Sequence, residues 1–218
     1  MGVGWGVVKL LYMKGKNSPQ QLFSWMNPKL EVKKTSKYGH GNFPVEKGGK
    51  KKYRNDTGEG NGVFAKEKIR KGETLFVMGG YILTIEDENS LKGIVADKPI
   101  EISESFSIGP HKASDLQKMP QHYVNHSCNP NTGFDGQIFM VAMKSIKEKE
   151  EIAYDYAMVM HANKDSDSFF TFECKCGARN CRKVVGENDW KISELQEKYN
   201  GFFQHYLQKK INKTKKYV

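Results

Sequence analysis

Long apolar runs are missing from this sequence. No hydrophobic stretch approaches the roughly 20 residues that a membrane-spanning helix needs, so we expect no contact with a membrane. Residues 1–11 are apolar, but no basic region precedes them and no small-residue cleavage site follows, as a signal peptide would require. Gly6 stands where a myristoylation signal needs Ser or Thr. We therefore expect an intracellular, monomeric protein, nuclear if the source is a eukaryote and cytoplasmic if it is a bacterium.

Cysteine is scarce, with four residues in a chain of 218. Three of them lie close together at Cys174, Cys176 and Cys181, whereas Cys128 lies far upstream. Disulfides are disfavoured because nothing marks the protein as secreted. Four thiolates make a closed tetrahedral zinc site, which would be structural because no coordination position stays open. The residues leave two hypotheses, a structural zinc site and four free thiols.

Internal repeats are also absent, and only one glycine-rich motif is noteworthy. Gly60-Asn61-Gly62 precedes the apolar segment Val63-Phe64-Ala65. A phosphate-binding loop would need a following helix and a lysine at a fixed offset, and neither is present. The motif is more typical of a backbone that approaches a ligand closely.

Acidic residues are fewer than basic ones, and the formal net charge is +10. The excess of Lys and Arg is concentrated in residues 47–54 and in the last ten residues. Such charge runs are usually solvated loops or tails. The alternative is contact with nucleic acid, because a basic surface attracts polyanions.

Short alternating segments separated by glycine or charged turns dominate residues 30–156, which predicts a mainly β (α+β) fold. Residues 60–65 predict a glycine-rich bend that runs into a strand, and residues 79–84 predict a continuation, after a kink, of the strand expected at 74–78. Further strands are expected at 30–33, 100–102, 107–109, 137–143 and 152–156. Residues 36–60 are rich in Gly, Lys and Asn and predict a long surface loop.

The C-terminal segment follows a helical pattern. Ser193 and Gln196 have the spacing of a capping box at a helix start. Apolar residues recur there every three or four positions, and Gly201 interrupts them, so we predict one or two amphipathic helices that pack on the domain. These residues are Leu195, Tyr199, Phe202, Phe203, Tyr206 and Leu207.

Four motifs follow one another in the order of a known family. They are Gly60-Asn61-Gly62-Val63-Phe64-Ala65, Asn125-His126-Ser127-Cys128-Asn129-Pro130-Asn131, Glu150-Glu151-Ile152-Ala153-Tyr154-Asp155-Tyr156, and the Cys-x-Cys-x4-Cys segment that starts at Cys174. Together they resemble the SET-domain protein-lysine methyltransferases that carry a post-SET zinc segment. The resemblance covers about residues 30–188, and its most specific parts are the Asn-His-Ser-Cys and Tyr-Asp-Tyr motifs.

The resemblance implies the SET β-clip, in which small curved sheets surround a pseudoknot and the 154–156 segment lies beside the Asn-His loop. A post-SET zinc-binding tail and short C-terminal helices would follow. It divides the chain into an N-terminal extension (1–29), a SET domain (30–160, with an insertion at about 36–60), a post-SET zinc segment (170–186) and a helical C-terminal extension with a basic tail (187–218).

The same resemblance implies the reaction and its residues. S-adenosylmethionine would donate a methyl group to a lysine side chain of another protein, for example a histone tail. Tyr156 and Tyr154 would be catalytic. The cofactor would bind at Asn61, Gly62, Phe64, Asn125, His126 and Tyr156. Structural Zn²⁺ would bind at Cys128, Cys174, Cys176 and Cys181.

Tyr154 stands where the family places Phe or Tyr to control how many methyl groups are added. A tyrosine hydroxyl there leaves less room for a methylated amine, so we expect mainly monomethylation. The alternative hypothesis is a catalytically silent SET module, an adaptor held together by zinc that binds chromatin or nucleic acid. The presence of Tyr156 and of Asn125-His126 favours the enzyme.

Overall fold

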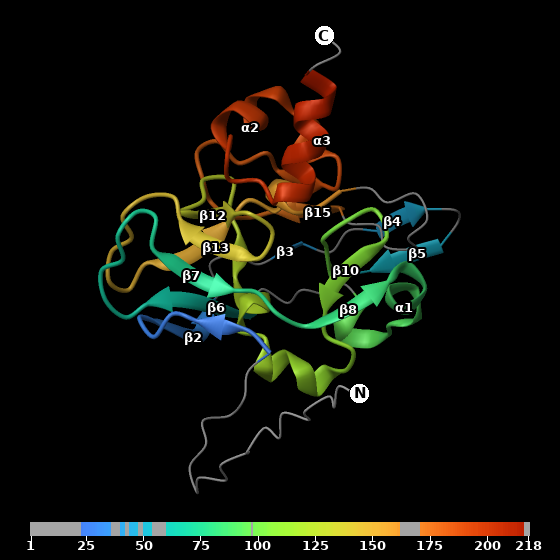
Figure 1. The fold of residues 1–218 in the computed structure, drawn as a ribbon, viewed down its shortest axis with the longest axis horizontal. Helices are drawn as coiled ribbons and strands as arrows, with labels where there is room; N and C mark the ends of the chain where they lie inside the picture. The colour runs from blue at the N-terminus through green and yellow to red at the C-terminus, as the bar shows by residue number, and fades with distance from the viewer. Residues whose placement is uncertain are drawn as a thin grey trace, which may run out of the picture.

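The computed structural model describes residues 23–35, 40–41, 44–47, 50–53, 60–96, 98–161 and 171–215. Most of the N-terminal extension and the end of the basic tail lie outside the described residues. Short strands dominate and helices are few in this part of the chain (Figure 1), which confirms the predicted mainly β fold. Over the same residues, none of the helices is long and apolar enough to span a membrane.

A four-stranded sheet brings the sequence motifs together. Its strands lie in the order β11 (Asn125–His126), β14 (Glu151–Tyr154), β6 (Gly60–Ala65) and β2 (Leu30–Thr35). The β11 and β14 strands are parallel, so Asn125 is opposite Ala153 and His126 is opposite Tyr154. The Asn-His stretch therefore lies beside the strand that leads to the Tyr-Asp-Tyr motif, although about 30 residues separate the two in the sequence.

The described residues form three further sheets of three or four strands. The first runs in the order β1 (Trp25–Met26), β7 (Thr74–Val77), β13 (Phe139–Ala142) and β12 (Thr132–Asp135). The second consists of β8 (Tyr81–Thr84), β10 (Phe106–Gly109) and β9 (Ile100–Glu101). The third consists of β16 (Val184–Gly186), β15 (Thr171–Cys174) and β3 (His40–Gly41).

The prediction that residues 36–60 form a loop was wrong for the described part of this segment. It contains β3 and a hairpin of β4 (Pro44–Lys47) and β5 (Lys50–Tyr53). The β3 strand pairs with β15, so the insertion contributes a strand to the sheet of the cysteine-containing tail. The lysines and glycines of the insertion give no strand pattern in the sequence. The β3 strand forms because β15, which is distant in sequence, supplies its pairing partner.

Helices are short and depend on local caps or packing. The α1 helix (Ile85–Ser90) starts with a capping box in which Thr84 Oγ1 accepts the Asp87 N–H (3.2 Å) and Asp87 accepts the Thr84 N–H (2.9 Å). The structure also contains 3-10 turns at Gly93–Val95, Ala113–Lys118, Pro120–Tyr123, Tyr156–Met158 and Asp189–Lys191.

The capping box predicted from Ser193 and Gln196 does not form. The α2 helix (Ser193–Lys198) has Ile192 at its N-cap, without a side-chain cap, and Ser193 is already helical. Gln196 Nε2 donates instead to the carbonyl of Trp190 (3.0 Å), which lies in the 3-10 turn that precedes the helix.

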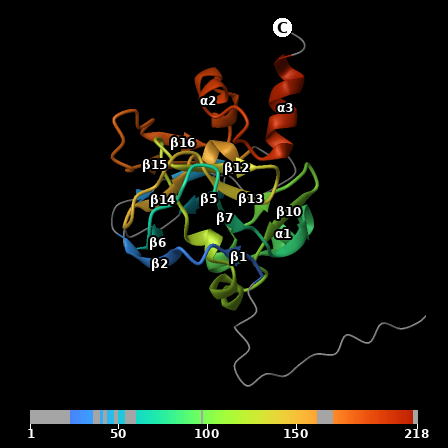
Figure 2. The ribbon, with the colours of Figure 1, turned by 60° about the vertical axis from the view of Figure 1, so that its left-hand side comes forward.

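The α2 helix and α3 (His205–Lys215) lie together over one end of the strands (Figures 1 and 2). Their buried apolar residues join the main hydrophobic core, which confirms the predicted packing. These residues are Leu195, Tyr199, Phe203, Leu207 and Ile211. Gly201, with a φ of 82°, forms the predicted break between the two helices, a conformation that glycine adopts without strain.

A polar network connects α3 to the β9–β10 turn. Lys210 Nζ contacts Glu104 Oε1 (2.5 Å), and the Tyr206 hydroxyl contacts His161 Nε2 (3.1 Å). His161 is buried, and burial together with the Lys210 charge lowers its pKa, although Glu104 opposes this shift. The folded protein thus favours the neutral imidazole.

This depressed pKa predicts a loss of stability in acid. The contribution of neutral His161 is fully present above the unfolded pKa, about 6.5, and is lost as the pH falls through that value. We expect His161→Gln to reduce the drop in unfolding free energy between about pH 7.5 and 5.5, as measured by urea denaturation. The control is His111→Gln, the same substitution at an exposed histidine. An unchanged pH dependence in His161→Gln would contradict the assignment.

Candidate active site

The Asn125–Asn131 stretch is anchored to β14 by side chains as well as backbone. Asn131 is buried, its Nδ2 donates to the Glu151 carbonyl (2.8 Å), and its Oδ1 accepts the Ala153 N–H (2.9 Å). The Ser127 N–H donates to the Tyr154 carbonyl (2.9 Å). The loop that follows β11 thus remains beside β14 up to Tyr154, at the residues where the Tyr-Asp-Tyr motif begins.

Glu151 occupies the space beside the glycine motif. Asn125 Nδ2 donates both to Glu151 Oε1 (2.9 Å) and to the Asn61 carbonyl (3.2 Å). A Cβ atom on Gly62 would lie 2.3 Å from Glu151 Oε1, so a larger residue here would have to displace this carboxylate. Sequence reasoning missed this buried glutamate, although an acidic residue at the start of an apolar strand was a usable signal.

His126 connects the cysteine cluster with Tyr156. Its Nε2 lies 3.3 Å from Cys128 Sγ, and its Nδ1 accepts the Tyr156 N–H (3.2 Å). Because Nδ1 accepts, the neutral ring carries its proton on Nε2, which faces the sulfur. The ring is buried and meets the Tyr156 and Phe172 rings edge to face.

The two tyrosines form one aromatic cluster. Their ring centroids are 4.9 Å apart, and Tyr154 also meets the Phe134 ring at 5.4 Å. Tyr154 is buried, whereas Tyr156 is only partly buried and its hydroxyl donates to the Val124 carbonyl (3.4 Å). The predicted strand 152–156 is wrong in its last two residues, because Asp155 caps a 3-10 turn that starts at Tyr156.

Asp155, between the two tyrosines, is fully buried and charged. Arg182 binds it through two parallel hydrogen bonds of 2.6 and 2.7 Å, and Tyr199 donates to it at 3.0 Å. Burial is the largest single effect and raises the pKa of Asp155, but the hydrogen bonds and charge of Arg182, the nearby His126 and the Ala157 N–H together hold the pKa below its ordinary value. Sequence reasoning overlooked Asp155, Arg182 and Tyr199 as a set, since partners so distant in sequence give no local signal.

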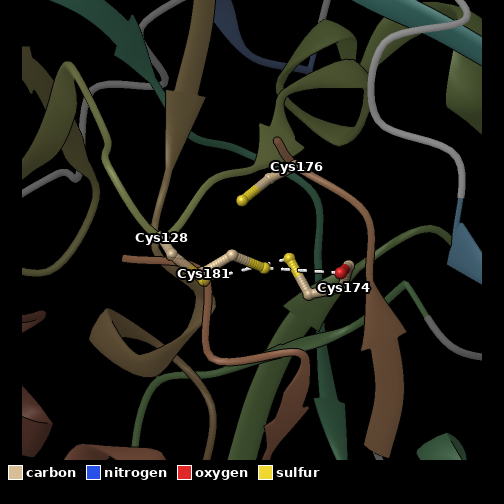
Figure 3. A group of neighbouring side chains, drawn as sticks. All are labelled: Cys128, Cys174, Cys176 and Cys181. Atoms are coloured by element: carbon tan, nitrogen blue, oxygen red, sulfur yellow. Dashed lines mark hydrogen bonds between the residues drawn. The ribbon is translucent and has the colours of Figure 1, made fainter. Parts of the chain in front are cut away.

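The four cysteines converge at one point (Figure 3), with all four Sγ atoms within 4.8 Å of one another. Zn–S bonds of about 2.3 Å in a tetrahedron require sulfurs about 3.8 Å apart. The measured separation between Cys128 and Cys174 Sγ is 3.8 Å. Backbone N–H groups of Arg182 and Lys183 donate to Cys128 and Cys181 sulfurs, each at 3.4 Å, which favours thiolates. The donor set fits a four-coordinate zinc ion.

The pKa values of the Cys128 and Cys174 thiols are shifted in opposite directions. Hydrogen bonds from Cys174, His126 and the Arg182 backbone, with the first the largest, lower the pKa of Cys128 to about 3 despite burial. The bond to the Cys128 thiolate raises the pKa of Cys174. A lowered pKa at Cys128, beside three other closely spaced sulfurs, favours capture of a thiophilic cation.

The residues predicted for the cofactor lie on neighbouring strands. Asn61 and Phe64 are on β6, Asn125 is on β11, and all three are partly exposed. Phe64 is opposite Glu151 in the register of β6 and β14. Tyr156 lies in the 3-10 turn that follows β14, the strand between β11 and β6.

Comparisons with known proteins agree with this geometry. Residues 60–157 match the family model described as the SET domain. The chain is 29% identical over 169 residues to histone-lysine N-methyltransferase ASHH3 of Arabidopsis thaliana, covering 71% of this chain and 43% of that protein. It is 27% identical over 169 residues to histone-lysine N-methyltransferase SUV39H1-A of Danio rerio, covering 61% and 40%.

Among solved structures, the chain is similar to the methyltransferase domain of human histone-lysine N-methyltransferase SETMAR. The identity is 19% and the TM-score 0.43, and the match covers 57% of this chain and 53% of that one. The chain spans about two fifths of the length of the curated relatives it matches. Residues 60–157, which hold the glycine, Asn-His and Tyr-Asp-Tyr motifs, are a SET domain, and the chain is a relative of SET-domain histone-lysine methyltransferases.

Proposed function

We propose that the chain is an S-adenosylmethionine-dependent protein-lysine methyltransferase. The observation that carries the proposal is the position of Tyr156 within the SET domain. Its ring lies against Tyr154 and His126, beside the cysteine cluster. The relatives are named as histone-lysine N-methyltransferases, which supports a histone or another protein as the substrate and a nuclear role in a eukaryote.

The chemical task of these residues is to align an uncharged amine. A lysine ammonium with a pKa of about 10.4 must lose its proton, which costs about 4–5 kcal/mol at pH 7. The aromatic cluster of Tyr154, Tyr156 and Phe134 disfavours the charged amine, because low-dielectric surroundings penalise charge. The Tyr156 hydroxyl then orients the amine, and such alignment lowers the barrier by removing orientational freedom. S-adenosylmethionine, when bound, supplies the electrophilic methyl group.

The cofactor residues of this proposal are Asn61, Gly62, Phe64, Asn125, His126 and Tyr156. Five of them lie on β6 and β11, and Tyr156 lies in the turn that follows β14. The Asn125 side chain connects the Asn61 carbonyl to the Asn-His loop through a hydrogen bond of 3.2 Å. Gly62 would contribute through its backbone, because Glu151 fills the space on its Cβ side. Glu151 holds the Asn125 amide in place and so sets where this part of the site lies.

Zinc would be structural, bound by Cys128, Cys174, Cys176 and Cys181. We propose the four-part division of the chain on the same basis, with the post-SET segment at 170–186 and the helical extension after it. The basic insertion and tail would contact nucleic acid, and the protein would act as a monomer.

The decisive experiment incubates the full chain with isotope-labelled S-adenosylmethionine and core histones, nucleosomes or a cell extract. We expect label on lysine side chains, located by mass spectrometry. Absence of transfer, with no heat of binding for S-adenosylhomocysteine in calorimetry, would instead support the catalytically silent adaptor.

Tyr156→Phe should lower the methyl-transfer rate by about 100-fold or more, since it removes the hydroxyl that orients the amine. Zinc content and the thermal midpoint should stay unchanged because the ring is kept. Tyr81→Phe is the matched control, as Tyr81 is exposed on β8. Wild-type transfer by Tyr156→Phe would refute the role of the hydroxyl.

We also propose that monomethylation predominates, because the Tyr154 hydroxyl restricts the space for a methylated amine. Tyr154→Phe should shift the products toward di- and trimethyl-lysine at similar total turnover. Intact-mass spectra of a peptide substrate over time measure this distribution. The same product ratio in variant and wild type would remove the proposal.

Cys128→Ser should abolish stoichiometric zinc binding, since it removes one of four ligands. Loss of an outer partner alone costs about 10- to 100-fold in metal affinity, and loss of a ligand should exceed this. Elemental analysis after dialysis measures the metal. Asn129→Ala is the control, because this neighbouring side chain is exposed. Retention of one zinc per chain by Cys128→Ser would show that Cys128 is not a ligand.

A further inference from the structure

The buried carboxylate of Asp155 is held by three separate segments. Its Oδ1 accepts the Ala157 N–H at 3.1 Å, within its own 3-10 turn. Arg182, which follows the last cysteine, supplies the two short bonds described above. Tyr199, at the C-cap of α2, donates its hydroxyl to Oδ2 at 3.0 Å. A residue from the C-terminal extension therefore reaches the position between Tyr154 and Tyr156.

The single proton of the Tyr199 hydroxyl has two acceptors within range. These are Asp155 Oδ2 at 3.0 Å and the Cys128 carbonyl at 3.3 Å. The Cys128 carbonyl also accepts from Asn180 Nδ2 and Lys198 Nζ, each at 3.0 Å. The proton therefore belongs to the carboxylate, which is closer and charged, and hydrogen bonds to charged groups are the stronger ones.

The extension also fixes the cation that binds Asp155. Arg182 Nε donates to Asp189 Oδ2 at 2.9 Å, while its terminal nitrogens bind Asp155. Asp189 starts the Asp189–Lys191 turn ahead of α2. Asp189 and Asp155 thus fix the orientation of the Arg182 guanidinium between them. The guanidinium in turn fixes the position of the Asp155 carboxylate.

The position of Asp155 determines that of Tyr156. Tyr156 is covalently bonded to Asp155, and its own N–H is held by His126 Nδ1 at 3.2 Å. Any displacement of Asp155 therefore moves the start of the 3-10 turn and the Tyr156 ring with it. Since interiors are closely packed, such a shift would be transmitted to the neighbouring aromatic rings.

We propose that Tyr199 is a positioning residue for Tyr156, acting through Asp155, so that the C-terminal extension is part of the catalytic unit. The effect on turnover rests on the proposed methyltransferase function, whereas the effect on the Tyr156 backbone does not. Tyr199 touches neither substrate nor cofactor in this role. It holds the carboxylate that determines where Tyr156 stands.

The test uses Tyr199→Phe in the full chain, because the ring that fills the core is retained. We expect the Tyr156 amide to exchange with deuterium about tenfold faster, as one hydrogen bond to a buried charge is lost. We expect kcat to fall about tenfold with the KM for a peptide substrate nearly unchanged, the mark of lost alignment. Bound zinc should be unaffected.

Tyr206→Phe is the matched control. Tyr206 lies in the same extension, but its hydroxyl contacts His161 and Lys210 and not Asp155. It should leave both the Tyr156 exchange rate and kcat as in wild type. Equal effects of the two variants would overturn the proposal, since docking of the extension alone would explain them.

The two readouts separate this inference from the proposed function. Faster Tyr156 exchange in Tyr199→Phe, with a wild type that transfers no methyl group, would retain the contact and reject the methyltransferase. An active wild type with unchanged exchange and kcat in Tyr199→Phe would reject the positioning role and retain the enzyme.

Discussion

The meeting of Cys128 with three cysteines from the tail is the contact on which the site depends. Its thiol lies 3.8 Å from Cys174 Sγ, and its carbonyl accepts from Asn180 and Lys198. The side chain and the backbone carbonyl of Cys128 therefore both contact segments that lie 46 or more residues downstream. Closing so long a loop is unfavourable for the chain, and a four-sulfur metal site is strong enough to offset it.

A second constraint is the charge that the fold accepts in its interior. Asp155 is entirely buried next to Tyr156, and its ionised form persists because Arg182 provides a planar pair of donors. Buried pairs of this kind add little net stability, but breaking one is costly because a charge is left alone. The pair therefore specifies one geometry around the tyrosines more than it strengthens the fold.

The parallel pairing of β11 and β14 explains how motifs distant in sequence form one site. It places His126 beside Tyr154 and aligns the Asn-His loop with the start of the Tyr-Asp-Tyr motif. His126 then connects the two halves, since one nitrogen faces Cys128 and the other accepts from Tyr156. The cysteine cluster and Tyr156 are thereby connected through a single buried ring.

Alternation and turn residues were enough to predict the mainly β fold, several of the strands between Leu30 and Tyr154 and the amphipathic C-terminal helices, because these patterns are local. They did not predict β3, β4, β5, β11 or β12. The number and type of the cysteines left a zinc site and free thiols both open, and the resemblance to the SET family implied the convergence that the structure contains. Only the tertiary structure decided that β3 joins the tail sheet, that Glu151 occupies the space beside Gly62, and that Tyr199 reaches Asp155. Each of these depends on a partner far away in sequence, and no local pattern encodes which distant side chain will neutralise or complement a buried group.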